Sequence, residues 1–279
     1  MNSLADTLAS HYATHDLEVV VINALVAAGK DPSKLVLEDL AAIDEFHIRG
    51  RKATIDLASR LHFDVSTEVL DLGCGLGGAS RYLASEYGCR VAGLDITEAY
   101  CRVAVMLTMR LGLSDRVSYH HGDALAMPFV DASFDIVWTQ HAMMNIADKD
   151  AFCTEVMRVL KPGGVLACYE IFSGTGGDVC YPVPWARDAA TSFLARPEQM
   201  RKVLEEVGFE IEHWQDTTEV GRNWFKRMGE KLRNQGPSPL GIHILLGDAF
   251  QSMAKNQVRN LNEDRISLIE AVARRPVGP

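Results

Sequence analysis

The stretch from Val69 to Gly78 reads Val-Leu-Asp-Leu-Gly-Cys-Gly-Leu-Gly-Gly. An apolar run typical of a strand leads into glycines at positions 73 and 75, and a helical pattern begins at position 78. Glycines at such a turn let a ligand approach the backbone, and the start of the helix presents unpaired N–H groups. The stretch therefore predicts a strand, a ligand-binding loop and a helix, in that order.

Outward from this loop, short β-branched runs alternate with longer helical patterns between about residues 66 and 172. We predict strands at 68–72, 90–95, 117–120, 134–138 and 165–171, and helices at 78–87, 97–111 and 149–160. Strands that alternate with helices form βαβ units. The predicted fold class is therefore α/β, a Rossmann-like parallel sheet with helices on both faces.

Two stretches depart from this alternation. Residues 1–64 show helical periodicity without strands, for example over 37–46, and are predicted to form an N-terminal helical cap. Residues 65–279 form the predicted ligand-binding domain, and a helical insertion at about 220–263 lies between strand candidates 210–214 and 267–273. Because roughly 40 residues is little for a separate core, we interpret the insertion as a lid.

Composition and charge exclude several classes of protein. Lys and Arg number 28 against 37 Asp and Glu, a formal charge of −9, so a chain-wide basic surface for nucleic acid or anionic membrane is absent. The longest apolar run, 17–28, is shorter than the roughly 20 residues of a bilayer span. The six cysteines form no C-x-x-C pair. We expect a cytoplasmic protein without a metal site; whether it is a homo-oligomer stays open.

Acidic residues near the strand ends suggest which ligand the loop holds. Asp95 ends the second strand, about 20 residues after the glycines, where a carboxylate accepts hydrogen bonds from ribose hydroxyls. Asp71 places a carboxylate beside the loop, which favours an ammonium group and disfavours a pyrophosphate. Asp123, with Ala124, follows the third strand and offers a carboxylate and an amide to an adenine. The pattern favours an adenosyl ligand over a dinucleotide.

Together with Arg158-Val-Leu-Lys-Pro-Gly-Gly164, these motifs resemble those of the class I S-adenosylmethionine-dependent methyltransferases. The resemblance implies S-adenosyl-L-methionine as the cofactor and a seven-stranded sheet of order 3-2-1-4-5-7-6. Ligands in such sheets bind at the carboxyl ends of the strands, where the strand order reverses. The resemblance further implies a set of cofactor-binding residues, namely Asp71, Gly73, Gly75, Gly77, Asp95, Ile96, Asp123, Ala124 and Gln140.

A narrower resemblance involves residues 43–54, Ile-Asp-Glu-Phe-His-Ile-Arg-Gly-Arg-Lys-Ala-Thr, together with the glycine loop and Asp95-Ile96-Thr97. They are similar to the sarcosine and dimethylglycine N-methyltransferases of the type 11 group. Those enzymes often read Phe-His-x-Gly-Gly, and this chain departs from that pattern at Arg49. The departure adds a cation near the cofactor and argues against a choline-like substrate.

Methyl transfer from a sulfonium depends mostly on alignment and desolvation, so a base is optional. His141, directly after the fourth strand, is the candidate general base; packing alone is the alternative. The candidate substrate residues are His47, Asn145, Tyr181, Trp185 and Trp224.

The predicted function is methyl transfer to a small molecule, with nitrogen of an amino-acid-like or amine metabolite favoured as the acceptor. Within the same class, the alternative is O- or C-methylation of a phenolic or quinone-like substrate. An NAD-dependent oxidoreductase shares the glycine loop and the acidic residue, although Asp71 and Asp123 argue against it. A non-catalytic scaffold that binds the cofactor is the remaining alternative.

Overall fold

The structure is a computed structural model, and it describes residues 17–278. Its centre is a seven-stranded sheet of order β3-β2-β1-β4-β5-β7-β6. Strands β1 to β5 pair in parallel, and β7 runs antiparallel to both β5 and β6. The strands are β1 (Glu68–Leu72), β2 (Arg90–Asp95), β3 (Val117–His121), β4 (Phe134–Gln140), β5 (Leu160–Ser173), β6 (Glu210–Asp216) and β7 (Ile266–Arg274). The predicted α/β fold and strand order are confirmed.

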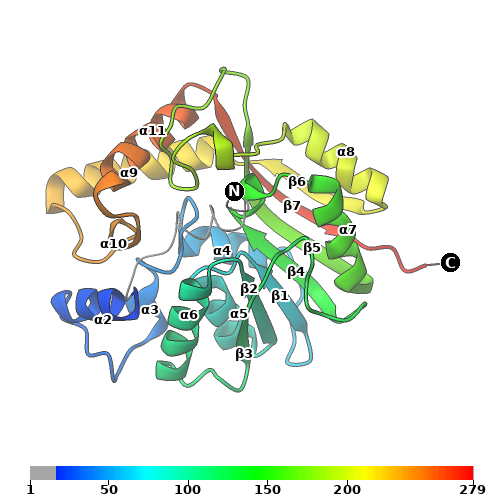
Figure 1. Cartoon of the computed structure of the whole chain (residues 1–279), viewed down its shortest axis with the longest axis horizontal. Coiled ribbons are helices and arrows are strands. Elements are labelled where there is room, and N and C mark those ends of the chain that lie inside the picture. The colour runs from blue at the N-terminus through cyan, green and yellow to red at the C-terminus, as the bar shows by residue number, and fades with distance from the viewer. Residues whose placement is uncertain (1–16, 279) are drawn as a thin grey trace.

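Helices cover both faces of the sheet (Figure 1). On one face α4 (Arg51–Ala58) and α5 (Gly78–Tyr87) pack on the apolar side chains of the central strands. On the other face α7 (Lys149–Val159) and α8 (Pro197–Val207) pack in the same way. The two cores explain why the central strands read as nearly continuous apolar runs, since their side chains are buried on both sides.

A third apolar cluster joins segments that lie far apart in the chain. It contains side chains of α2 (Leu17–Ala27), α3 (Leu37–Leu40), α6 (Glu98–Arg110) and α10 (His243–Leu246). The N-terminal segment therefore contacts the insertion, as Figure 1 shows for α2 and α10. The first 16 residues of the predicted cap lie outside the described residues, and the division into a cap and a domain stays a prediction.

The predicted helix over 37–46 was wrong beyond Leu40, because the following residues form turns. Two buried carboxylates account for the difference. Asp44 accepts a hydrogen bond from Arg81 of α5 at 2.7 Å, and Glu45 pairs with Arg51 of α4. Both carboxylates point toward cations of other elements, and a regular helix would not direct two adjacent side chains in this way.

The insertion between β6 and β7 forms α9 (Thr218–Gln235), α10 and α11 (Phe250–Asn262), with a 3₁₀ turn at Gly247–Ala249. These helices lie beyond the carboxyl ends of the central strands, at the upper left of Figure 1. Within residues 17–278, no helix combines the length and the apolar character needed to cross a bilayer.

Candidate active site

The glycine loop between β1 and α5 has a backbone that glycine alone adopts easily. Gly73, Gly75 and Gly77 have φ angles of 69°, 53° and 81°. A Cβ on Gly73 would lie 2.4 Å from the Cβ of Ala142, in the loop after β4. The absence of side chains thus brings the loops after β1 and β4 together, and it leaves a bare backbone surface that fits a ligand.

Asp95, the last residue of β2, is fixed by this loop. Its Oδ2 accepts a hydrogen bond from the N–H of Gly75 at 2.9 Å, and its Oδ1 accepts one from the N–H of Thr97 at 2.8 Å. Burial raises the pKa of Asp95, while the two N–H donors oppose that shift. A carboxylate oxygen can accept more than one hydrogen bond, so the carboxylate fits the two hydroxyls of a ribose.

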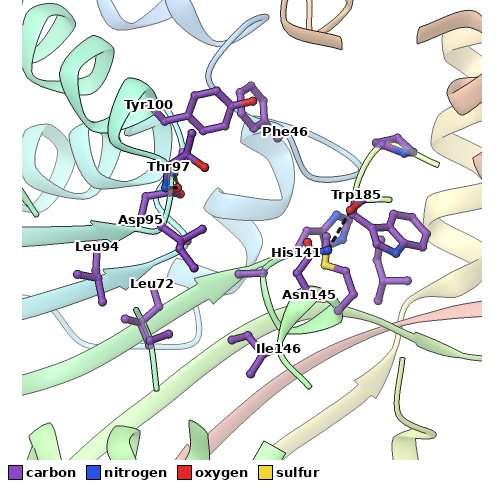
Figure 2. Close-up of a pocket in the computed structure, with 18 of the residues that line it drawn as sticks. Phe46, Leu72, Leu94, Asp95, Thr97, Tyr100, His141, Asn145, Ile146 and Trp185 are labelled. Atoms are coloured by element: carbon purple, nitrogen blue, oxygen red, sulfur yellow. Dashed lines mark hydrogen bonds between the residues drawn. The ribbon is translucent and has the colours of Figure 1, made fainter. Parts of the chain in front are cut away.

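A cavity of about 470 Å³ runs from Asp95 across the carboxyl ends of β1 and β4. Figure 2 shows two groups of side chains facing each other across it, Asp95, Thr97, Tyr100 and Phe46 on one side and His141, Asn145 and Trp185 on the other. Of the residues predicted from the sequence, it is lined by Gly73, Gly75, Asp95, Ile96, Asp123, Ala124, His141, Asn145 and Trp185.

The first group forms one end of the cavity, which we call the cofactor end because the sequence predicts the cofactor there. Asp123 lines it beside Gly122 and Leu125, with its Oδ1 held by the N–H of Leu125 at 2.9 Å. Phe46 and Tyr100 close over this end, their rings in edge contact at 5.7 Å between centroids. Neither aromatic residue was predicted as a site residue. The only signal was the position of Phe46 next to His47 in the Phe-His motif.

His141 begins the second group. It has a φ of 53°, a conformation that residues other than glycine seldom adopt and that recurs at functional sites. Its Nδ1 accepts a hydrogen bond from the N–H of Ile48 at 3.4 Å, which assigns the ring proton to Nε2. Burial, and secondarily His47, lower the pKa of His141 well below the usual value, so the imidazole is neutral. Its Nε2 is buried and has no hydrogen-bond partner among the described residues.

Asn145 and Trp185 form the wall next to His141. The side-chain amide of Asn145 donates to the carbonyl oxygens of Trp185 at 2.9 Å and Thr191 at 2.8 Å. The indole N–H of Trp185 donates to the Ser192 hydroxyl at 2.9 Å. These bonds tie the loop after β5 to the loop after β4, so the wall is held by polar contacts behind an apolar surface.

Six predicted site residues lie outside the cavity lining: Asp71, Gly77, Gln140, His47, Tyr181 and Trp224. Asp71 accepts a hydrogen bond from Ser80 at 2.5 Å, and burial raises its pKa to about 7. Its carboxylate therefore supports the start of α5. The Oε1 of Gln140 accepts from Trp138 at 2.9 Å and from Thr54 at 3.1 Å.

His47 lies behind His141, with ring centroids 6.0 Å apart. Its Nε2 contacts the carbonyl oxygen of Gly50 at 3.0 Å, and burial lowers its pKa to about 4. Tyr181 and Trp224 pack against the core on the side of α4 and α5. Among residues 17–278 no group of three or more side chains is arranged to hold a metal ion.

Comparison with known proteins agrees with this geometry. Residues 70–168 match the family model described as a methyltransferase domain. The chain is 32% identical to Methyltransferase GfsG of Streptomyces halstedii over 187 residues. This match covers 66% of this chain and 67% of that protein. It is 27% identical to the glycine/sarcosine/dimethylglycine N-methyltransferase of Actinopolyspora halophila, over 80% of this chain but 38% of the relative.

Other relatives are O- and C-methyltransferases, and the matches span only about a quarter to a third of the length of three of them. A solved structure of the phosphoethanolamine N-methyltransferase 2 of Haemonchus contortus in complex with S-adenosyl-L-methionine shares the fold. Its TM-score is 0.76 at 20% identity, and the match covers 99% of this chain and 60% of that one.

The bare glycine loop, the fixed Asp95 carboxylate and the Asp123 loop lie together at one end of the cavity. When bound, S-adenosyl-L-methionine would supply an electrophilic methyl group on sulfur, and the residues that line this end of the cavity, Asp95 and Asp123 among them, would hold it. With the match to GfsG over two thirds of both proteins, the chain belongs to the class I S-adenosylmethionine-dependent methyltransferases.

Proposed function

We propose that this enzyme transfers the methyl group to the hydroxyl oxygen of an apolar small molecule. The observation that carries the proposal is the lining of the cavity on the side of β4 and β5. Met144, Ile171, Pro184 and Trp185 form its wall, and the polar amide of Asn145 is already bonded to backbone. Such a surface favours an acceptor with an apolar body, because it offers little to replace the water around the ammonium and carboxylate groups of an amino acid.

The charged residues around the cavity argue against an amino acid as the acceptor. No Lys or Arg among the described residues lines the cavity. Arg49 pairs with Asp56, and Arg222 pairs with Glu219 and Asp264. The carboxylate of an amino-acid substrate would therefore be desolvated without a cationic partner, which is costly. The lining thus favours the second of the two acceptor classes predicted from the sequence, and the nitrogen acceptor stays an untested prediction.

The state of His141 fits an acceptor that is an oxygen anion. In its assigned tautomer the ring donates from Nε2, and its low pKa keeps it neutral. A neutral donor stabilises a phenolate oxygen without protonating it. The hydroxyl proton leaves to water, the oxygen forms a bond to the methyl carbon, and the bond from carbon to sulfur breaks with its electrons remaining on sulfur. His141 here orients the oxygen and is not required as a base.

A panel of acceptors with radiolabelled S-adenosyl-L-methionine tests the proposal. Each apolar phenol or alcohol is paired with an amino acid or amine of similar size, and the label in each product is counted. We expect transfer to the apolar hydroxyl compounds and little to the amino acids. Turnover confined to carboxylate-bearing amines would contradict the proposal and restore the nitrogen prediction.

A further inference from the structure

Glu170 is a buried carboxylate on β5 that the proposed chemistry does not use. Its side chain is fully buried, at 0% exposure. It accepts hydrogen bonds from the hydroxyl of Thr139 at 2.8 Å, from the N–H of Ala142 at 3.1 and 3.2 Å, and from the N–H of Met143 at 3.1 Å. Two of its three donors are therefore backbone groups of the loop that follows β4.

Lys149 holds the other end of the same loop. Its ammonium donates to the carbonyl oxygens of Met143 at 2.8 Å, of Phe193 at 2.9 Å and of Ile146. Met143 is thus held twice, by its N–H through Glu170 and by its carbonyl through Lys149. Because the ammonium of Lys149 donates to three backbone carbonyl groups, it fixes this turn. Its positive charge also balances the negative charge of Glu170.

The segment held in this way forms much of the cavity wall. Every residue from 141 to 148 except Met143 lines the cavity. His141 keeps its unusual φ at the start of the segment, and the Cβ of Ala142 occupies the space beside Gly73. A shift of Ala142 would therefore move both the cavity wall next to His141 and the glycine loop after β1.

We propose that Glu170 is a positioning residue for methyl transfer, which holds residues 141–148 through the N–H groups of Ala142 and Met143 while Lys149 holds the carbonyl groups. Methyl transfer requires the acceptor in line with the methyl carbon, and a displacement of about 1 Å can cost about a hundredfold in rate. The inference rests on the proposed function for its kinetic part, whereas the ordering of the segment is measured without any acceptor.

The ionisation state of Glu170 should change how firmly it holds residues 141–148. Burial raises the pKa of Glu170 to about 7. The ionised carboxylate accepts from all its donors, and protonation removes acceptor capacity, so the hold strengthens as pH rises through about 7. Lys149 faces the carboxylate from α7 and Cys168 from β5, and apolar Ile269 lies beside it on β7. Cys153 of α7 interacts with Lys149 and Cys168. Burial lowers the pKa of Lys149 to about 8 and raises those of both thiols.

The matched control is Glu270 of β7, a second buried carboxylate, at 2% exposure. It contacts Arg60 at 3.1 Å and His213 at 3.3 Å, and it lies outside the cavity lining. The variants Glu170→Gln and Glu270→Gln are compared with the wild-type enzyme by hydrogen exchange of segment 141–148 without ligands. The kcat and KM for the acceptor found in the panel are then measured between pH 6 and 8.

For Glu170→Gln we expect exchange in the segment to become about tenfold faster, and kcat to fall about ten- to hundredfold with a smaller change in KM. The rise in kcat through pH 7 should disappear. Glu270→Gln should leave all three readouts as in the wild type, even where it lowers the melting temperature.

Wild-type exchange and an intact pH step in Glu170→Gln would overturn the inference, and so would equal loosening of the segment in both variants. If Glu170→Gln does not fold, Lys149→Met releases the same segment from its half-buried end and should speed its exchange; unchanged exchange would count against the inference. If the wild type turns over no acceptor, the proposed function fails while the exchange measurement still decides the role of Glu170.

Discussion

Asp95 makes the most specific contact that we assign to the cofactor, because both of its oxygens are fixed at the cavity by backbone donors. Asp95→Ala should weaken binding of S-adenosyl-L-methionine by about 1.5 to 3 kcal/mol, the range of a hydrogen bond to a charged group. Titration calorimetry measures this loss. The control is Asp135→Ala, because Asp135 accepts hydrogen bonds from the backbone N–H of Glu68 and the ammonium of Lys161 and lies outside the cavity lining. Equal losses in the two folded variants would contradict the assignment.

His141 gives a second prediction at the scale of the residue. Because its pKa lies well below the usual value, the step in kcat near pH 7 belongs to another group and should persist in His141→Asn. Asparagine tolerates the positive φ and keeps a donor, so His141→Asn should retain about ten times more activity than His141→Ala. The pH profiles of both variants are the measurement. A pH step that vanishes in His141→Asn would show that the imidazole titrates during catalysis.

The predictable part of the site consists of residues at or just after the carboxyl ends of strands. Asp95 ends β2, and Gly73, Asp123 and His141 lie in the loops after β1, β3 and β4; parallel strands bring these ends to one side of the sheet. Tyr100 lies on a helix face, where a buried aromatic residue is indistinguishable from core packing. Asp71 is the opposite case: its position beside the loop did not indicate that its side chain would bond to Ser80, outside the cavity lining, and its part in cofactor binding stays a prediction.

At the scale of the element, α10 of the insertion covers the cofactor end of the cavity. Leu245 packs in the same cluster as Tyr100, and Leu246 lines the cavity. Leu246→Ala should weaken cofactor binding by about 1 to 2 kcal/mol, part of the value of a buried leucine. Leu232→Ala on α9, where the side chain is 55% exposed, should leave the affinity unchanged. Equal affinities of Leu246→Ala and the wild type in calorimetry would rule out this role for α10.

Elements with a strong local pattern were predictable to the residue. β1, α5 and β2 have the predicted bounds, since strand periodicity and glycine at the helix ends define them. The segment after α3 was not predictable, because its course depends on Arg81, a cation 37 positions away from Asp44. Local sequence contains no information on such a contact.

At the scale of the molecule, the pair of Asp44 and Arg81 joins the N-terminal segment to α5. Both side chains are fully buried. Asp44→Asn should lower the free energy of unfolding by about 3 to 5 kcal/mol, because it leaves a buried guanidinium without its anion. Glu206→Gln breaks the exposed pair with Lys202 and should cost less than about 1 kcal/mol. Urea unfolding compares the two; a loss in Asp44→Asn no larger than in Glu206→Gln would contradict the link.

The most direct test of the whole account is where the methyl group goes. The enzyme is incubated with S-adenosyl-L-methionine carrying a ¹³C methyl group and an equal mixture of apolar phenols, alcohols, amino acids and amines, and one carbon NMR spectrum of the products is recorded. The chemical shift distinguishes methyl bound to oxygen, carbon or nitrogen. The cavity lining predicts label on the oxygen of an apolar acceptor. Label on the nitrogen of a carboxylate-bearing amine would contradict the account.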